Sequence, residues 1–322
     1  MFIRSRSDTF ARKIGGIFFM KEAPQAAPDT VLHTLGIGPD DLLGQGGETW
    51  VYALDKARVA RIYRPGTTAS GVNGRISLLQ EMAANAHRVP FAIPTVLDKL
   101  EIDEHWVTIE RRLPGRPLID LLAEVRGPSR ERLIMAYLEA AAAIHRLNVA
   151  RPWYGELLDG PDAIRTATYR EYLARRAARN LAEAGADFAH VSAPALAEAL
   201  PEPDTPSLVH LDAFAGNMLA NEDGMITAVI DFGVVAIMGD ARLDALATAV
   251  YLDPAITPTA TDRDRRLAQN WLVDNDLAHL YQPARRWLAA FWSFAQDDPP
   301  LHQWCRDVLL YGKRPSTSLY TG

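Results

Sequence analysis

The sequence changes character at Pro114–Gly115, and this change constrains the fold more than any other feature. Before the dipeptide, short runs rich in β-forming residues alternate with turns, as at 49–54 and 58–63, and one helical pattern lies at 74–88. After it, amphipathic helical patterns dominate. This order predicts an α+β chain in which a small β-rich lobe precedes a larger helical one, with a cleft between them. The remaining strand patterns lie at 92–103 and 105–113, and the later helical patterns at 118–125, 130–148, 167–186, 194–200, 241–252, 263–275, 284–296 and 300–310.

The composition is compatible with a globular chain and excludes some classes of protein. The 322 residues are 48% hydrophobic and 23% charged, which is ample for a core and, by length, for about two lobes. A net charge of −6 gives no sign of a basic surface that would bind nucleic acid, so no nucleic-acid partner is expected. Cys305 is the single cysteine, which excludes an intrachain disulfide and favours a reducing, cytoplasmic setting.

The N-terminus has basic residues followed by a short apolar run at 14–20. The run is shorter than the roughly 20 residues needed to cross a bilayer, and no small-x-small cleavage site follows it. We expect residues 1–28 to form a poorly ordered tail, with Met20 as an alternative start. No stable membrane association is expected, because no other segment resembles a span.

Three polar residues stand out in two apolar segments, LVHLDAFAGNML (208–219) and VIDFGVV (229–235). Asp212 and Asn217 flank a short loop, and Asp231 ends a short strand. Carboxylate and amide oxygens suit Mg²⁺, which usually takes one or two carboxylates plus substrate phosphates. Each residue alone could instead be an ordinary turn residue that bonds its own backbone.

A glycine-rich stretch, LLGQGGETWVYAL, precedes the second strand pattern and carries Gly44, Gly46 and Gly47. Such a turn lets backbone N–H groups approach phosphates closely. By itself, a hairpin loop with three glycines is more often a simple turn.

Taken together, HLDAFAGN and the following IDFG resemble the catalytic and metal loops of the aminoglycoside phosphotransferase family, whose pattern is His-Gly-Asp-x-x-x-x-Asn and then Ile-Asp-Phe/Trp. The resemblance implies a two-lobed protein-kinase-like fold with a small antiparallel sheet and one helix in the N-lobe. It implies transfer of phosphate from ATP or GTP, with Mg²⁺, to a hydroxyl of a small molecule. Asp212 would be the base, Asn217 and Asp231 the metal ligands, and His210 a structural residue of the loop.

The same resemblance extends to the N-terminal half, where residues 29–112 would form the nucleotide-binding lobe and 113–322 the lobe with the catalytic loop and acceptor site. Gly44, Gly46 and Gly47 would cradle phosphates, and Arg61 would hold them from the next strand, with Arg58 and Arg64 facing solvent. Glu81, the acidic residue of the 74–88 helix, would pair with Arg61. The backbone around Glu110 and Arg112 would meet adenine.

The chain also departs from the family pattern. Leu211 stands where Gly is usual, and Phe214-Ala215-Gly216 replaces His-Pro-Gly. In GDARLDAL (239–246), Asp240 would cap a helix beginning near 241 and Asp244 would brace the catalytic loop. His145 would be a satisfied core or capping residue.

Several readings of the function stay open. The chain could be an active small-molecule kinase, a catalytically inactive kinase-like nucleotide-binding module, or a nucleotidyl transferase on the same fold. The acceptor could be an antibiotic, a sugar or an amino alcohol. A C-terminal group of aromatic residues could be core or, with Asp297–Asp298, a rim for the acceptor, including a cationic one. Its members are Trp271, Trp287, Phe291, Trp292, Phe294 and Trp304.

Overall fold

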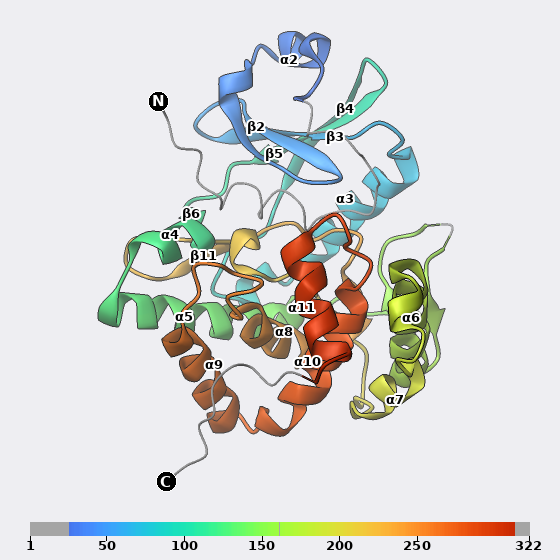
Figure 1. The fold of residues 1–322 in the computed structure, drawn as a ribbon. Coiled ribbons are helices and arrows are strands. Elements are labelled where there is room, and N and C mark those ends of the chain that lie inside the picture. Colours follow the sequence, from blue (N-terminus) through green and yellow to red (C-terminus); the bar gives the residue numbers. More distant parts are fainter. Residues whose placement is uncertain (1–25, 161, 313–322) are drawn as a thin grey trace.

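The computed structural model describes residues 26–160 and 162–312, and they form two lobes (Figure 1). The predicted tail, 1–28, lies almost wholly outside the described residues. Of its last three residues, Ala27 is buried and its N–H donates to the Tyr52 hydroxyl at 3.3 Å. Within the described ranges, every helix is too short or too polar to cross a membrane.

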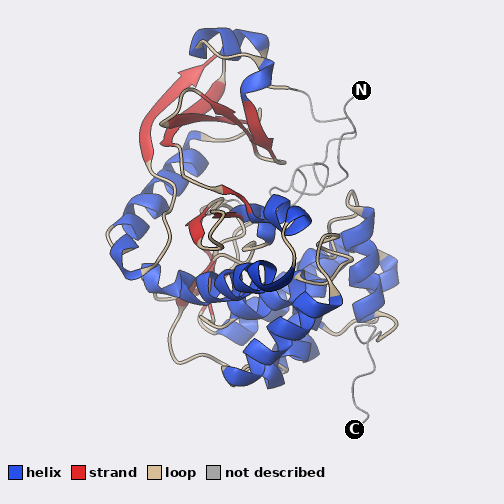
Figure 2. Ribbon diagram, turned by 90° about the vertical axis from the view of Figure 1, so that its left-hand side faces the viewer, coloured by secondary structure: helices blue, strands red, loops and turns tan. Residues whose placement is uncertain are grey.

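The N-lobe is built on an antiparallel five-stranded sheet of order β1-β2-β3-β5-β4. Side chains alternate between its faces, as strand geometry requires. One face packs against helix α2 (Asp29–Leu35) through a small core that includes Tyr52, Ile62 and Val107. The opposite face carries buried polar residues of the central strands, among them Arg61, Thr108 and Glu110. Figures 1 and 2 show the sheet stacked on the mainly helical C-lobe. The strands are β1 (Leu42–Gln45), β2 (Thr49–Ala53), β3 (Arg58–Tyr63), β4 (Val96–Ile102) and β5 (His105–Arg111).

Helix α3 (Ala69–Ala83) begins five residues before the predicted start, because the Thr68 side chain caps it by accepting from the Gly71 N–H at 3.2 Å. Its buried residues Leu78, Leu79 and Met82 belong to the large core shared with the C-terminal helices, and not to the small core of the sheet. The helix therefore connects the two lobes.

The C-lobe is mainly helical, as predicted, around one large core in which Trp287 is fully buried. Trp271, Phe291 and Trp304 lie in the same core, so most of the aromatic group packs helices together. The helices are α4 (Leu118–Glu124), α5 (Gly127–Ala143), α6 (Tyr169–Ala184), α7 (Ala193–Glu198), α8 (Leu243–Tyr251), α9 (Asp262–Asp274), α10 (Tyr281–Trp292) and α11 (Pro299–Leu309).

Two small sheets complete the C-lobe and frame the segments singled out in the sequence. One has the order β11-β10-β6 and the other β8-β7-β12-β9. Their strands are two to four residues long, too short for a visible alternation in the sequence. They are β6 (Arg116–Pro117), β7 (Tyr154–Glu156), β8 (Arg165–Thr166), β9 (Ser207–Val209), β10 (Met218–Ala220), β11 (Ile226–Val229) and β12 (Ile237–Gly239).

The lobes are joined by backbone at two places. The connector after β5 enters the C-lobe as β6, which pairs with β10. Ala92, between α3 and β4, forms a parallel bridge with Ala228 of β11 through Ala92 N–H to Thr227 O at 2.9 Å and Val229 N–H to Ala92 O at 3.0 Å. The connector requires a glycine at 115, where φ is 111° and a Cβ atom would lie 2.4 Å from the Thr227 hydroxyl oxygen.

Replacing Gly115 by Ala should destabilise the protein more than the same change at Gly66. Both glycines have positive φ, but a Cβ at Gly66 would meet nothing within 4 Å. The shared backbone penalty is about 1–2 kcal/mol, and crowding against Thr227 and Ala220 should add about 1–3 kcal/mol at Gly115 alone. Urea unfolding of both variants measures the difference, and equal losses would show that the close approach does not matter.

Candidate active site

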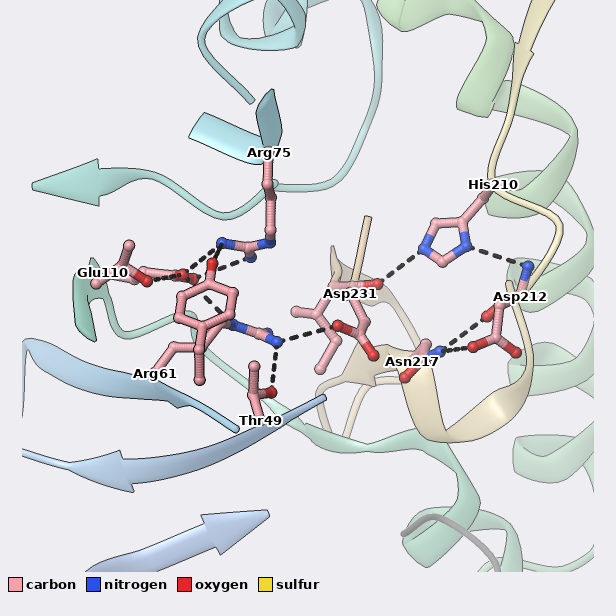
Figure 3. Close-up of polar contacts among 11 residues, drawn as sticks. Thr49, Arg61, Arg75, Glu110, His210, Asp212, Asn217 and Asp231 are labelled. Atoms are coloured by element: carbon pink, nitrogen blue, oxygen red, sulfur yellow. Dashed lines mark hydrogen bonds and ion pairs between the residues drawn. The ribbon is translucent and has the colours of Figure 1, made fainter. Parts of the chain in front are cut away.

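The catalytic-loop candidates lie between β9 and β10. Asp212 is 2% exposed, and Asn217 ends the 3₁₀ turn Ala215–Asn217. The Asn217 amide nitrogen donates to the backbone oxygen of Asp212 at 2.9 Å and to its carboxylate Oδ2 at 3.0 Å (Figure 3). The other carboxylate oxygen, Oδ1, is buried and has no hydrogen-bond partner among the described residues. The loop therefore fixes the carboxylate by one oxygen and leaves the second free for a ligand.

Leu211 adopts the left-handed conformation that explains the glycine usual in the family pattern. Its φ is 66°, yet its side chain is fully buried. The Asp244 carboxylate accepts from the N–H groups of His210 and Leu211, both at 2.8 Å, and the Tyr251 hydroxyl donates to Leu211 O at 2.5 Å. Asp244 braces the loop as predicted. Burial raises the pKa of Asp244 to about 7, although the two N–H donors favour its charged form.

His210 connects the two candidate loops, in keeping with the structural role expected of it. Its Nε2 lies 2.8 Å from the backbone oxygen of Ile230, the residue before Asp231, and its ring packs on Phe232 at 4.5 Å between centroids. Burial lowers the pKa of His210. A neutral ring with its Nε2 hydrogen donated to Ile230 fits this arrangement.

The other residues of the GD element and His145 have structural contacts. Asp240 accepts from the Arg242 N–H at 2.9 Å and forms an ion pair with its guanidinium, next to the start of α8 at Leu243. His145 lies half-buried after α5, with Nδ1 2.8 Å from Ala142 O. Neither residue touches the catalytic loop through a hydrogen bond in the described part of the chain.

Asp231 faces the N-lobe across the cleft. Its φ is 65°, its side chain is 34% exposed, and its Oδ1 lies 3.1 Å from Nη1 of Arg61 on β3. The same Arg61 nitrogen donates to the Thr49 hydroxyl at 3.0 Å. Arg61 is thus the inward-facing cation predicted for this strand, and it joins the sheet to the candidate metal loop (Figure 3).

The anion that holds Arg61 comes from β5 and not from helix α3. Glu110 lies 3.4 Å from Arg61 Nε and accepts from Arg75 of α3 at 2.7 Å, with all three side chains buried. Burial opposes ionisation of Glu110, but Arg75, Arg61 and the Thr108 hydroxyl outweigh it and lower its pKa to about 2. The helix therefore supplies a second cation where an acid was predicted.

The predicted pairing of Glu81 with Arg61 is wrong. Glu81 lies about 1.7 turns further along α3 than Arg75, on another side of the helix. Its carboxylate forms a bidentate ion pair with Arg151 of the C-lobe at 2.8 and 2.9 Å. It also accepts from the Ala150 N–H at 3.3 Å. Helical periodicity puts Glu81 on the side of α3 that faces the C-lobe, so its contact fixes the lobes together.

The glycine-rich stretch forms the end of the first hairpin. Gly44 lies within β1 at a register shift, whereas Gly46 and Gly47 lie in the turn before β2. Arg64 holds this turn, because its guanidinium donates to Gly46 O at 3.1 Å and lies 3.8 Å from the centre of the Trp50 ring. Arg58 is exposed as expected, but the expectation that Arg64 faces solvent is wrong.

Glu48, at the tip of the same turn, was missed in the sequence. Burial, with repulsion from Asp231, raises its pKa to about 7 despite the attraction of Arg61 and Arg75. Its side chain is half-buried and lies opposite Gly233, where a Cβ atom, if present, would be 3.8 Å from Oε2 of Glu48. The signal in the sequence was an acidic residue within a glycine turn of the kind that binds phosphate. A basic or uncharged residue is expected in such a turn.

Backbone groups of the segment predicted to contact adenine already form hydrogen bonds within the protein. The Arg112 N–H donates to Ala57 O at 2.8 Å and its guanidinium to Asp55 O at 3.3 Å. Glu110 pairs with both neighbouring strands, and its side chain belongs to the buried ion pairs described above. The Arg112 N–H is therefore used within the protein, and a contact between the backbone of this segment and adenine stays a prediction.

The carboxylates of the cleft repel one another. Burial, then Asp231 and Glu48, raises the pKa of Asp212 well above its usual range, against the bond from Asn217. A divalent cation between these groups would lower this repulsion. Besides Oδ1 of Asp212, the oxygens Asn217 Oδ1 and Asp231 Oδ2 have no hydrogen-bond donor among the described residues, and all three are hard ligands of the kind Mg²⁺ prefers.

The donor set would suit a metal that binds together with phosphates. Among the described residues, no group of three or more His, Cys, Asp or Glu side chains could hold a metal by itself. Mg²⁺ usually keeps waters and takes only one or two carboxylates plus phosphate oxygens. The residues present therefore fit Mg²⁺ that arrives with a nucleotide.

Comparison with known proteins agrees with this geometry. The Phosphotransferase enzyme family matches residues 42–253, more than half of the chain, and the chain belongs to this family. A comparison with curated protein sequences finds no match.

Solved structures support the fold. The GDP and kanamycin complex of APH(2″)-IIIa is 16% identical, covers 83% of this chain and 90% of its own, and has a TM-score of 0.51. The GDP complex of wild-type aminoglycoside 2′-phosphotransferase-IIIa is 17% identical, covers 87% and 100%, and has a TM-score of 0.52. The fold is therefore the predicted two-lobed protein-kinase-like one.

Glu110→Gln should destabilise the protein by about 3–5 kcal/mol, because it leaves two buried arginines without their shared anion. Glu81→Gln removes a partly exposed ion pair and should cost less than about 1 kcal/mol. Both changes keep the side-chain volume, so urea unfolding of the two variants compares the ion pairs directly. A larger loss of stability for Glu81→Gln than for Glu110→Gln would mean that Glu81, and not Glu110, is the principal anion of the cleft.

Proposed function

We propose that the protein transfers the terminal phosphoryl group of ATP or GTP to a hydroxyl of a small molecule. The observation that carries this proposal is the free, buried Oδ1 of Asp212, held in a braced loop beside Asn217 and across the cleft from Arg61 and Asp231. In this proposal residues 29–112 bind the nucleotide and 113–322 bind the acceptor. A cytoplasmic setting belongs to it, because the reaction needs a supply of nucleoside triphosphate.

Asp212 would accept a hydrogen bond from the acceptor hydroxyl and take its proton as the oxygen attacks phosphorus. One bond forms between the acceptor oxygen and the terminal phosphorus, the bond to the bridging oxygen breaks, and nucleoside diphosphate leaves. Mg²⁺ held by Asn217 and Asp231 would offset the charge of the phosphates. Arg61 would offset charge from the sheet side, so positioning and electrostatics supply most of the rate.

The raised pKa of Asp212 is compatible with this role. A base works best when its pKa lies near the working pH, and burial moves an aspartate in that direction. Binding of Mg²⁺ near Asp231 would remove the like-charge contribution and leave burial as the main one. Asp212 would then lose its proton more readily with the nucleotide bound than without it.

Addition of ATP or GTP with Mg²⁺ should raise the melting temperature of the full chain. Ligand at 100 times its dissociation constant stabilises a native state by about 2.7 kcal/mol. Chelation of Mg²⁺ should abolish most of the shift, because Asn217 and Asp231 would act through the metal. Absence of a shift with either nucleotide would count against the proposal.

Asp212→Asn should lower kcat about 10²–10⁴-fold and keep the nucleotide-induced shift in melting temperature. No loss of stability is expected, because burial already disfavours the charged form. Asp223→Asn, on an exposed turn, is the control and should change neither quantity. The product mass distinguishes added phosphate from added nucleotide. Full turnover by Asp212→Asn would remove this residue from its role.

A further inference from the structure

An acidic side chain extends from the glycine-rich turn of the N-lobe toward the C-lobe. Glu48 directly precedes β2, and its backbone is fixed because the Arg64 N–H donates to Glu48 O at 2.8 Å. Its carboxylate lies opposite Gly233, where a Cβ atom would be 3.8 Å from Oε2 of Glu48. Glu48 therefore reaches from the turn to the candidate metal loop, which contains Asp231.

The charges around Glu48 do not balance. Asp231 repels its carboxylate and Arg61 attracts it, but Arg61 also donates to Asp231 at 3.1 Å (Figure 3). Arg75 forms an ion pair with Glu110 at 2.7 Å, so this buried pair adds no net charge. The two carboxylates and the one guanidinium that remain leave one negative charge between the turn and the candidate metal loop.

The basic residue nearest to the turn in the sequence is directed to other groups. The guanidinium of Arg64 donates to Gly46 O at 3.1 Å and lies 3.8 Å from the centre of the Trp50 ring. Glycine turns bind phosphate through backbone N–H groups, which attract any phosphate. An acid that extends from such a turn toward Asp231 acts against this attraction, and its effect is strongest on phosphates whose charge is not neutralised.

We infer that Glu48 makes the site select nucleotide that carries a divalent cation over metal-free nucleotide. This inference rests on the proposed function and states which form of the nucleotide the same site accepts. The phosphates of metal-free nucleoside triphosphate carry several negative charges, so Glu48 and Asp231 both repel them. A divalent cation on the phosphates offsets this repulsion, because a bound divalent ion is the largest local charge in such a site. Arg61 offsets only part of it, since Asp231 and Glu110 share its charge.

The test is calorimetric titration of the full chain with ATP and with GTP, each in excess Mg²⁺ and in excess EDTA. A pH of about 8 keeps Glu48 ionised, because its pKa is about 7. Glu48→Gln removes one negative charge beside the phosphates. It should tighten binding of the metal-free nucleotide about 10-fold or more and change binding of the Mg²⁺ complex less than about 3-fold. Equal dissociation constants of the wild type and Glu48→Gln for metal-free nucleotide would overturn the inference.

Glu101→Gln is the matched control, because it removes the same charge from the same lobe. Glu101 is exposed on β4, the outer strand of the sheet, so its loss should change neither dissociation constant. Glu48→Ala removes the carboxylate together with most of the side chain and should act as Glu48→Gln does. The effect of Glu48→Gln should be smaller for the nucleoside monophosphate, which lacks the terminal phosphates. Equal tightening of monophosphate and triphosphate would contradict the assigned place of Glu48.

Two further outcomes would give Glu48 a different role and overturn the inference. If Glu48→Gln tightens binding of both forms by the same factor, the carboxylate merely occupies the place of a phosphate in the empty site. If it weakens binding of the Mg²⁺ complex and leaves the metal-free form unchanged, the carboxylate is a ligand of the metal.

Nucleotide binding and phosphoryl transfer are measured separately, so the failure of this inference differs from the failure of the proposed function. Transfer is read from product mass with a panel of antibiotics, sugars and amino alcohols. If the selection depends on Glu48 and no acceptor is phosphorylated, the proposed function fails and the inference stands. If an acceptor is phosphorylated and Glu48→Gln leaves the selection unchanged, the inference fails and the proposed function stands. Absence of nucleotide binding in both forms would overturn both.

Discussion

The candidate site depends on the two hydrogen bonds that the Asp244 carboxylate accepts from the backbone of the catalytic loop. Left-handed backbone costs a residue such as Leu211 about 1–2 kcal/mol, whereas hydrogen bonds to a charged group contribute about 1.5–3 kcal/mol each. The bonds therefore outweigh the strain, and the Tyr251 hydroxyl adds a third contact. Because Leu211 directly precedes Asp212, these bonds also hold the backbone from which the buried Asp212 carboxylate projects.

A second buried network sets the charge on the N-lobe side of the cleft. One anion, Glu110, serves two cations, Arg61 and Arg75, and the Thr108 hydroxyl completes its bonds. Arg61 retains contacts to Thr49 and Asp231, so its charge stays directed at the cleft. The two cations and the shared anion leave a net positive charge, which offsets the repulsion among Asp212, Asp231 and Glu48.

The local sequence pattern predicted much of this fold but fewer of the contacts between the side chains of the candidate site. Strands β2 and β3 end within a residue of their predicted bounds, because turns and β-forming residues mark them clearly. The ion-pair partner of Glu81 on helix α3 was predicted wrongly. The acid itself was visible in the sequence, but its partner Arg151 lies 70 residues away and was not predictable from local periodicity. Asn217 donates to Asp212, and its backbone accepts from Ile230, next to Asp231, so the three residues lie close together; that they form one catalytic site stays a prediction. Sheets of three-residue strands carry no readable alternation, so they were missed.

The way the lobes are joined limits how they can move. A rigid body held at two points can rotate only about the line through them, and a third attachment off that line stops the rotation. The Ala92 bridge and the β6–β10 pairing are backbone attachments and supply the two points. The packing of Leu78, Leu79 and Met82 of α3 in the large core is a third attachment. The ion pairs Arg61–Asp231 and Glu81–Arg151 add to it, so the sheet has no free hinge axis and keeps its orientation relative to the loop that carries Asp212 and Asn217.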